Sequence, residues 1–336
     1  MNIALIIFLM IAGLAALSCS VLIFRRGSRL FAIPAAYLGI IAFTWATVGL
    51  QSDGYYAAAT ISQTESTRPV EKTVDEFVSS DTCRSCHPGE YHSWHKSYHR
   101  TMTQLATEES VMGDFENGFV GNFPGLEVSM KKDGENFLVN YLIGNPQGVR
   151  KLLDRRVVMT TGSHHYQVYW TDESWVEDEK PGDKTAWLVP FVYHFEEQRW
   201  LPRYATFITP PIHLPENRRW NQVCSRCHST HGAAKYDPVA DIHTTQVVEF
   251  GISCEACHGP GKEHIEANRN PLRRYGLHRA GNGDDSIVNP AKLNHRRSAE
   301  VCGRCHSNYM SLNLDKRQEW NEQGQSFRPG DVLSEH

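Results

Sequence analysis

Cys254-Glu-Ala-Cys257-His258 is one of four copies of a five-residue pattern around which the rest of this chain is organised. The other copies are Cys83-Arg-Ser-Cys86-His87, Cys224-Ser-Arg-Cys227-His228 and Cys302-Gly-Arg-Cys305-His306. Two thiols at this spacing can both form thioether bonds to one porphyrin, while the adjacent imidazole reaches its iron. Each copy is therefore typical of a c-type haem site, and the sequence predicts four covalently bound haem c groups.

Structural zinc and disulfide bonds are the alternative explanations for paired cysteines. Neither explains a histidine directly after every second cysteine. The motifs use eight of the nine cysteines, and the ninth is Cys19. We therefore predict that the eight motif cysteines hold the porphyrins. The predicted proximal iron ligands are His87, His228, His258 and His306.

Two long apolar segments precede the first motif, Ile3–Phe24 and Leu30–Leu50, and neither contains an acidic or basic residue. Each is long enough to span a bilayer as a helix. The basic residues between them, at 25–29, place that loop in the cytoplasm by the positive-inside rule. We therefore expect two transmembrane helices in the cytoplasmic (inner) membrane and a haem domain on the periplasmic, extracytoplasmic side. The alternative is a signal peptide cleaved near Ala57–Ala59.

The composition predicts three parts. Residues 1–51 form the anchor, 52–80 a polar tether, and 81–336 the tetrahaem cytochrome c domain. Within this domain, alternating apolar and polar residues predict a β-rich insertion at about 115–207. Its predicted strands are Leu126–Met130, Phe137–Ile143, Arg156–Thr161, Tyr166–Trp170 and Trp187–Phe195.

The predicted fold class is a mainly α multihaem cytochrome c core with little regular structure, a small β-rich insertion and an N-terminal transmembrane helical hairpin. Porphyrins supply buried apolar area that side chains would otherwise supply, so such a core needs few long elements. Pro88 predicts the start of a helix that continues to about Ala106. That helix would carry His92, His95 and His99 on one face.

The net charge is −4, and haem propionates would add further negative charge. This balance argues against nucleic acid as a partner. It is compatible with electrostatic docking to a basic redox partner.

Two stretches resemble the multihaem cytochromes of the cytochrome c-554 type. One runs from Cys83 through Trp94 to His99, and the other from Gly251 to His264. The resemblance implies crossed bis-histidine ligation, in which His99 is the distal ligand of the His258 haem and His264 that of the His87 haem. The type protein lacks the predicted hairpin and the insertion, so its partner and substrate do not transfer.

The distal ligands of the second and fourth haems stay open. The family's type protein has no sixth protein ligand at its second haem. Candidates for the haem of His228 are His231, His213, His164 and His165. For the haem of His306 we favour His295 over His278 and His243.

The leading hypothesis is a membrane-anchored tetrahaem cytochrome that relays electrons from a membrane quinol-oxidising complex or similar donor to another cytochrome, alone or as a subunit of a larger complex. A second is a multihaem oxidoreductase with an open haem at His228, acting on a small nitrogen or sulfur compound. A third is a tetrahaem quinol dehydrogenase, against which the two apolar segments and the long insertion argue. No pattern marks a substrate acid or base, so an electron-transfer protein is favoured over an enzyme.

Overall fold

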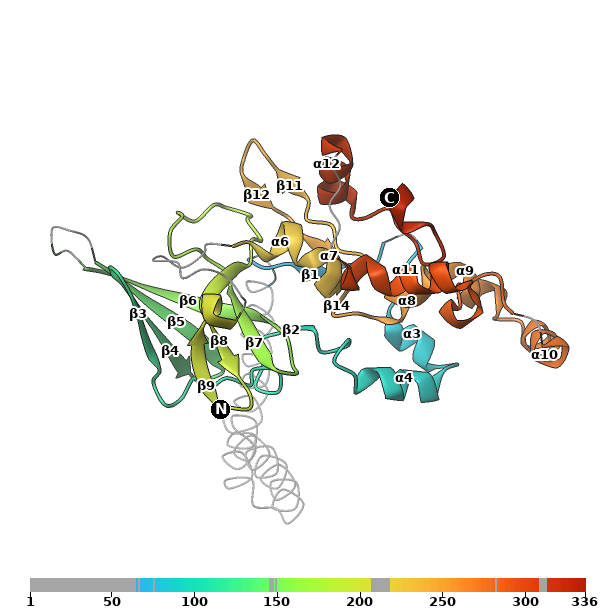
Figure 1. Ribbon diagram of the computed structural model, residues 1–336, viewed down its shortest axis with the longest axis horizontal. Helices are drawn as coiled ribbons and strands as arrows, with labels where there is room; N and C mark the ends of the chain where they lie inside the picture. Colours follow the sequence, from blue (N-terminus) through green and yellow to red (C-terminus); the bar gives the residue numbers. More distant parts are fainter. Residues whose placement is uncertain are drawn as a thin grey trace, which may run out of the picture. The chain divides into compact units, whose positions relative to one another are not determined.

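The computed structural model describes residues 65 and 67–336, apart from 75, 145–147, 149, 207–217, 282 and 308–312. The chain divides into two units, Met1–Glu65 and Ser66–His336. The helices and strands of the described residues belong to the second unit (Figure 1).

An eight-stranded antiparallel sheet is the largest element (Figure 1). The path β3-β4-β5-β6-β7-β8-β9 follows the chain order, and β2 also pairs with β6. Tight turns join β3 to β4 and β4 to β5, and Gly134 has the φ of +58° that the turn between β4 and β5 needs. The strands are β2 (Thr103–Leu105), β3 (Val120–Phe123), β4 (Leu126–Asp133), β5 (Asn136–Gly144), β6 (Arg150–Thr161), β7 (Tyr166–Thr171), β8 (Trp187–His194) and β9 (Arg199–Pro202).

Side chains of this sheet contribute to two apolar clusters. In β4 and β5 every second residue is buried, and Val128 and Tyr141 are fully buried in a cluster with Phe115 and Trp200. The second cluster joins Met159 and other residues of β6 to β8 with Trp220 and Val247. Because Trp220 precedes the second motif by only a few residues, this cluster fixes the haem-bearing segments against the sheet.

The motifs lie on or beside short helices, whose bounds are α3 (Ser80–Arg84), α4 (Pro88–His95), α6 (Trp220–Val223), α7 (Ser225–His228), α8 (Cys254–His258) and α11 (His295–His306). The remaining helices are α5 (Arg203–Thr206), α9 (Lys262–Ala267), α10 (Pro271–Ala280), α12 (Leu314–Gln323) and the 3-10 turns η1 (Pro290–Lys292) and η2 (Leu333–Glu335).

Three two-stranded pairs complete the described elements. They are β1 (Val70–Glu71) with β13 (Gln246–Val247), β10 (Ser229–Thr230) with β14 (Glu249–Phe250), and β11 (Tyr236–Asp237) with β12 (Ile242–His243). Strand β1 and the buried Phe77 fall within the predicted tether 52–80, so this part of the tether packs against the domain.

The predicted fold class, a mainly α core with a small β-rich insertion, is wrong. The predicted strands are present as β4 to β8, but β2, β3 and β9 extend them into one continuous sheet. This sheet buries an apolar cluster of its own. It is therefore a major structural element with its own core, and not a small insertion. The alternation of apolar and polar residues indicates each strand in the sequence. The pairing that joins the strands into one sheet depends on contacts between residues far apart in the chain.

The helix predicted from Pro88 to about Ala106 also ends early. Helix α4 stops at His95, and Thr103–Leu105 pairs with Met159–Thr161 as strand β2. The ladder with β6 satisfies the backbone groups that a helix would otherwise have paired. His99 consequently lies in the connection between α4 and β2, away from the helix that carries His92 and His95.

No helix of the described residues is long and apolar enough to cross a bilayer. The longest of them, α11, has 12 residues, whereas a spanning helix needs about 20. The prediction of an integral inner-membrane protein is therefore wrong for this part of the chain. The two predicted spans, Ile3–Phe24 and Leu30–Leu50, lie outside the described residues.

The sheet core predicts a measurable difference between two valines on paired strands. Val128 is 0% exposed and Val120 is 51% exposed. Val128→Ala should lower the free energy of unfolding by about 2 kcal/mol, because it removes buried methyl groups and leaves a cavity. Val120→Ala should cost less than about 0.5 kcal/mol. Urea unfolding followed by far-ultraviolet circular dichroism measures both, and equal losses would contradict this packing.

Candidate haem centres

The motif helices begin where the sequence supplies caps. The Ser79 hydroxyl accepts a hydrogen bond from the backbone N–H of Asp81 and caps α3. The Asn294 side chain accepts from the backbone N–H of Arg297 and caps α11. Such caps stabilise a first helical turn. They help to fix the helical turns on which the cysteines of the first and fourth motifs lie.

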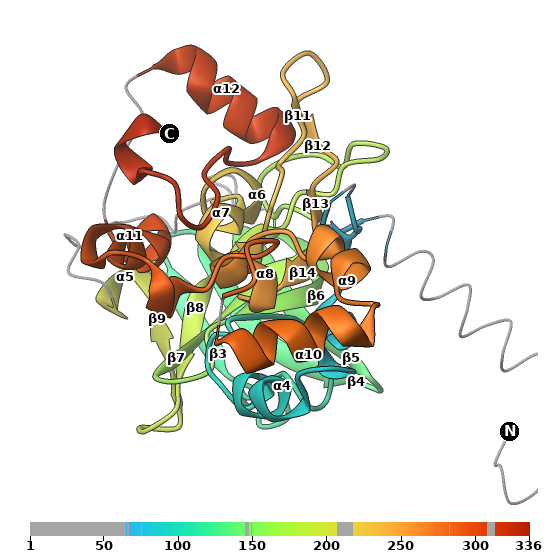
Figure 2. The same ribbon diagram turned by 90° about the vertical axis from the view of Figure 1, so that its right-hand side faces the viewer.

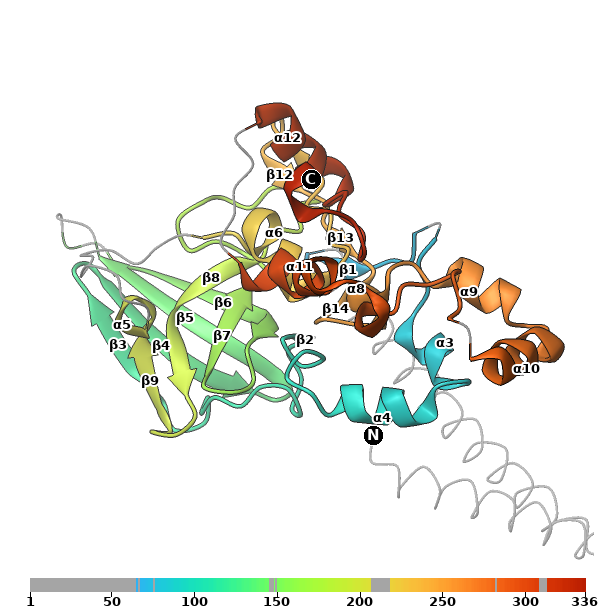
Figure 3. The same ribbon diagram turned by 45° about the vertical axis from the view of Figure 1, so that its right-hand side comes forward.

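The four motifs contact one another in pairs. Helix α3 contacts α8 (both labelled in Figure 3), and α7 contacts α11 (both labelled in Figure 2). The Cys83 thiol lies close to that of Cys254, and the interaction with Cys254 raises the pKa of Cys83. The Cys305 and Cys227 thiols also lie close together, and their interaction raises the pKa of Cys305 and lowers that of Cys227. The first motif is therefore adjacent to the third, and the second to the fourth.

The third and fourth motifs are also neighbours, because the Cys257 thiol interacts electrostatically with the thiols of Cys302 and Cys305. The contacts connect the motifs in the order first, third, fourth, second. This order differs from the order along the chain.

The imidazole rings of His87 and His264 lie close together. Their ring centroids are 6.2 Å apart and their planes differ by 25°. Two imidazoles bound to one metal ion through bonds of about 2 Å have ring centres roughly 6 Å apart. The spacing fits an axial pair on one haem iron, which is the arrangement that the family resemblance implies for His264.

The other nitrogen of His264 is held by a carboxylate. Its Nδ1 lies 3.2 Å from Oδ2 of Asp284. The carboxylate favours a proton on Nδ1, which leaves the Nε2 lone pair free for a metal, whereas the Asn268 amide nitrogen, 3.1 Å from the same Nδ1, favours the opposite tautomer. Burial lowers the pKa of His264 and opposes its protonation, although Asp284 acts in the opposite direction.

His99 faces a different motif from the one that the family resemblance implies. Its ring centroid is 6.1 Å from that of His306, with an interplanar angle of 77°. This spacing also fits two ligands of one iron. The structure thus pairs His99 with the fourth motif, whereas the sequence assigned it to the haem of His258.

Hydrogen bonds to the backbone of Ile252 explain how His99 is placed beside His306. The indole Nε1 of Trp94 donates to the carbonyl of Ile252 at 2.7 Å, and the N–H of Ile252 donates to the carbonyl of His99 at 2.9 Å. Gly251 has a φ of +74°, and a Cβ there would lie 2.2 Å from the carbonyl oxygen of Arg100. Only glycine allows this close approach.

His258, the proximal histidine of the third motif, is oriented by a neutral group. Its Nδ1 donates to the backbone carbonyl of Val288 at 2.8 Å, which fixes the tautomer that a metal-binding imidazole needs. Among the described residues, no second histidine ring contacts it.

His228 has the least defined surroundings of the four proximal histidines. Its Nδ1 is buried without a hydrogen-bond partner among the described residues, and burial lowers its pKa. No described histidine ring contacts its own. His213, one of the predicted candidates for its distal ligand, lies outside the described residues.

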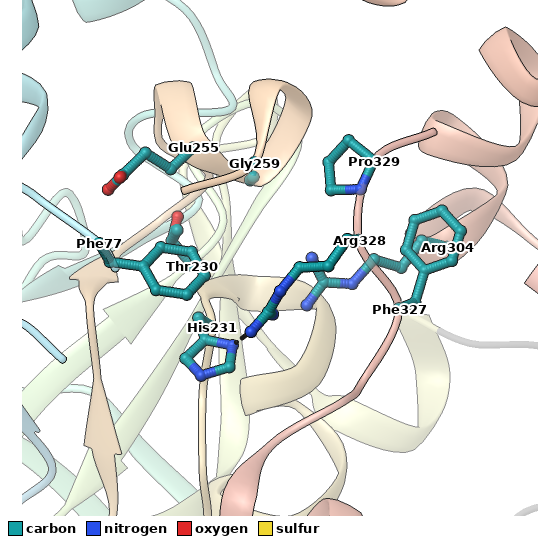
Figure 4. Close-up of a pocket in the computed structure, with 10 residues that line it drawn as sticks. Phe77, Thr230, His231, Glu255, Gly259, Arg304, Phe327, Arg328 and Pro329 are labelled. Atoms are coloured by element: carbon teal, nitrogen blue, oxygen red, sulfur yellow. Dashed lines mark hydrogen bonds between the residues drawn. The ribbon is translucent and has the colours of Figure 1, made fainter. Parts of the chain in front are cut away.

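His231, another of those candidates, is held by other contacts (Figure 4). Its ring stacks on Phe77 at 4.5 Å, and Arg328 donates to its Nδ1 at 3.3 Å. Nδ1 is thus an acceptor, which places the proton of the neutral ring on Nε2 and removes the lone pair that iron would need. Burial and the nearby Arg328 and Arg304 lower the pKa of His231 to about 4. These contacts indicate a structural role for His231.

His295, the residue favoured as the distal ligand of the fourth haem, lies far from His306. His295 and His306 are the first and last residues of the 12-residue helix α11, so they lie roughly 16 Å apart along its axis. Two ligands of one iron cannot be so distant, and the described histidine whose ring lies beside His306 is His99. His165 is exposed in the turn after β6, and its neighbour His164 stacks on Tyr98.

A haem iron needs only two protein ligands, so a pair of imidazoles is sufficient without a larger cluster. Within the described ranges, no three His, Cys, Asp or Glu side chains converge on a metal-ion site. The cysteines and ring pairs therefore fit haem c, at least at the first and fourth motifs. Sequence reasoning did not find Asp284 or Val288, because neither belongs to a motif and both act through long-range contacts.

A family model described as Cytochrome c554 and c-prime matches residues 207–259. The matched segment contains the second and third motifs and covers less than half of the chain. This similarity supports a c-type cytochrome with covalently bound haem and a general role in electron transfer. No significant match was found to any curated protein or to any solved structure.

The ring pairs predict which histidines control the spin state of which haem. His264→Ala and His99→Ala should each convert one low-spin ferric haem to high spin, because each removes one of two axial ligands. His92→Ala, at an exposed histidine of α4, is the control and should leave all haems unchanged. Electron paramagnetic resonance (EPR) of the oxidised proteins measures the outcome.

Adding His99→Ala to a double variant that lacks the fourth haem identifies the haem that His99 serves. When the fourth site is removed by Cys302→Ala and Cys305→Ala, adding His99→Ala should produce no further high-spin signal, whereas adding His264→Ala still should. A new high-spin haem after His99→Ala in this background would show that His99 serves another motif.

Proposed function

We propose that this chain is a tetrahaem c-type cytochrome that relays single electrons between redox partner proteins. The observation that carries the proposal is the facing pair of His87 and His264, because two imidazole ligands give a six-coordinate, low-spin haem suited to electron transfer. Bound haem supplies the one-electron change between ferric and ferrous iron. The residues of this chain hold it, orient its ligands and set its potential.

The contacts among the motifs support a connected path. Electrons would pass between the sites in the order first, third, fourth, second, since Cys83 contacts Cys254, Cys257 lies near Cys302, and Cys305 contacts Cys227. The two ends of this path are the sites of His87 and His228. A donor would dock at one end and an acceptor at the other.

The surroundings of His228 favour a second candidate function. No described histidine faces this ring, so its haem could keep an open coordination position and react with a small nitrogen or sulfur compound. The other three haems would then supply or remove electrons. In this case the chain is an oxidoreductase, and its reactive site is the terminal haem of the path.

EPR of the fully oxidised protein, with haem content measured on the same sample, separates the two functions. The relay predicts four haems per chain and only low-spin signals. Near-parallel rings at His87 and near-perpendicular rings at His306 should give two low-spin species of different anisotropy. A stoichiometric high-spin signal that shifts on addition of nitric oxide or nitrite would instead support the oxidoreductase. Fewer than four haems would contradict the tetrahaem proposal.

A further inference from the structure

We propose that Asp284 is a positioning residue for His264 and that its negative charge lowers the reduction potential of the first haem. The inference rests on the proposed function, because it requires a haem at the first motif. No sequence motif includes Asp284. Its role follows from the contacts that converge on its carboxylate.

The carboxylate of Asp284 is fixed by donors from several segments. Its Oδ1 accepts from the backbone N–H of Ser286 at 3.0 Å, from the Ser286 hydroxyl at 2.5 Å and from Arg273 of α10 at 2.9 Å. Its Oδ2 accepts from the Asn268 amide at 2.5 Å and lies 3.2 Å from Nδ1 of His264. These contacts leave the carboxylate little freedom to turn away from the imidazole.

Asn268 connects the carboxylate to the helix that carries the ligand. Its amide nitrogen also donates to the backbone carbonyl of His264 at 2.9 Å, one turn earlier in α9, and lies 3.1 Å from Nδ1 of the same residue. Asp284 and His264 are both mostly shielded, with side-chain exposures of 15% and 22%. Water therefore competes weakly for this contact, and the orientation of the ring toward His87 is set by the protein.

A carboxylate changes the electronic character of the imidazole as well as its direction. A proton shared between Nδ1 and a carboxylate makes the ring a more basic ligand. A more basic ligand stabilises ferric iron over ferrous iron and lowers the potential. The third motif differs in this respect, since Nδ1 of His258 meets the neutral carbonyl of Val288. We therefore expect the first haem to have a lower potential than the third, other contributions being equal.

The next residue along the chain provides a matched control. Asp285 carries the same charge in the same loop, but its side chain is 99% exposed, and its nearest ion-pair contact is with Arg273 at 3.6 Å. Asp284→Asn and Asp285→Asn remove the same charge, and only the first alters the contact with His264. Asp284→Glu keeps the charge and serves as the conservative variant.

The experiment is a potentiometric titration of the haem-loaded full chain and the three variants, combined with EPR. Asp284→Asn should raise one of the four midpoint potentials by about 59 mV, a tenfold change in the one-electron equilibrium constant. The low-spin signal of the near-parallel ring pair should change with it. Asp285→Asn should leave all four potentials unchanged, and Asp284→Glu should retain most of the low potential.

Two outcomes would decide against the proposal. One is equal behaviour of Asp284→Asn and Asp285→Asn in both potentials and spectra. The other is an Asp284→Asn shift that Asp284→Glu reproduces in full, which would show that the charge does not matter. Conversion of one haem to high spin in Asp284→Asn alone would support the positioning role. Failure of the proposed function is distinguishable, because the unmodified protein would then lack a haem at the first motif.

Discussion

The contact between the connection that follows α4 and the Gly251–Ile252 backbone is the constraint on which the haem-bearing part depends. Trp94 and Ile252 are 158 positions apart, yet they share a hydrogen bond that ties the first motif region to the third. The same junction fixes His99 through the Ile252 N–H. Without it, the ring of His99 would have no defined position relative to the fourth motif.

The long insertion that forms the sheet is compatible with this junction, because the chain enters and leaves the sheet close to the haem motifs. Strand β2 starts the sheet shortly after His99 and contacts β14, which immediately precedes the third motif. Trp220 is fully buried against β6 to β8. It holds the chain against the sheet just before the second motif. The long insertion therefore does not separate the motifs in space, and it supplies a rigid surface on which they pack.

The sequence predicts the components of this structure better than their connections. The motifs give the cysteines and proximal histidines directly, and alternation gives β4 to β8. Pairing of β2 with β6 shortens the predicted helix at His95, and no local pattern signals it. His264 faces His87 as the family resemblance implies, but the resemblance assigns His99 to the third motif instead of the fourth. Asp284 carries no local signal, because its importance comes from the five groups that meet at its carboxylate.

The central claim is that His264 and His99 complete the ligand pairs of the first and fourth haems. An experimental structure of the haem-loaded protein tests it most directly, because it shows the nitrogen atoms bound to each iron. We predict the first iron between His87 and His264 and the fourth between His306 and His99. A first or fourth iron bound by a different distal residue, or by none, would contradict the account.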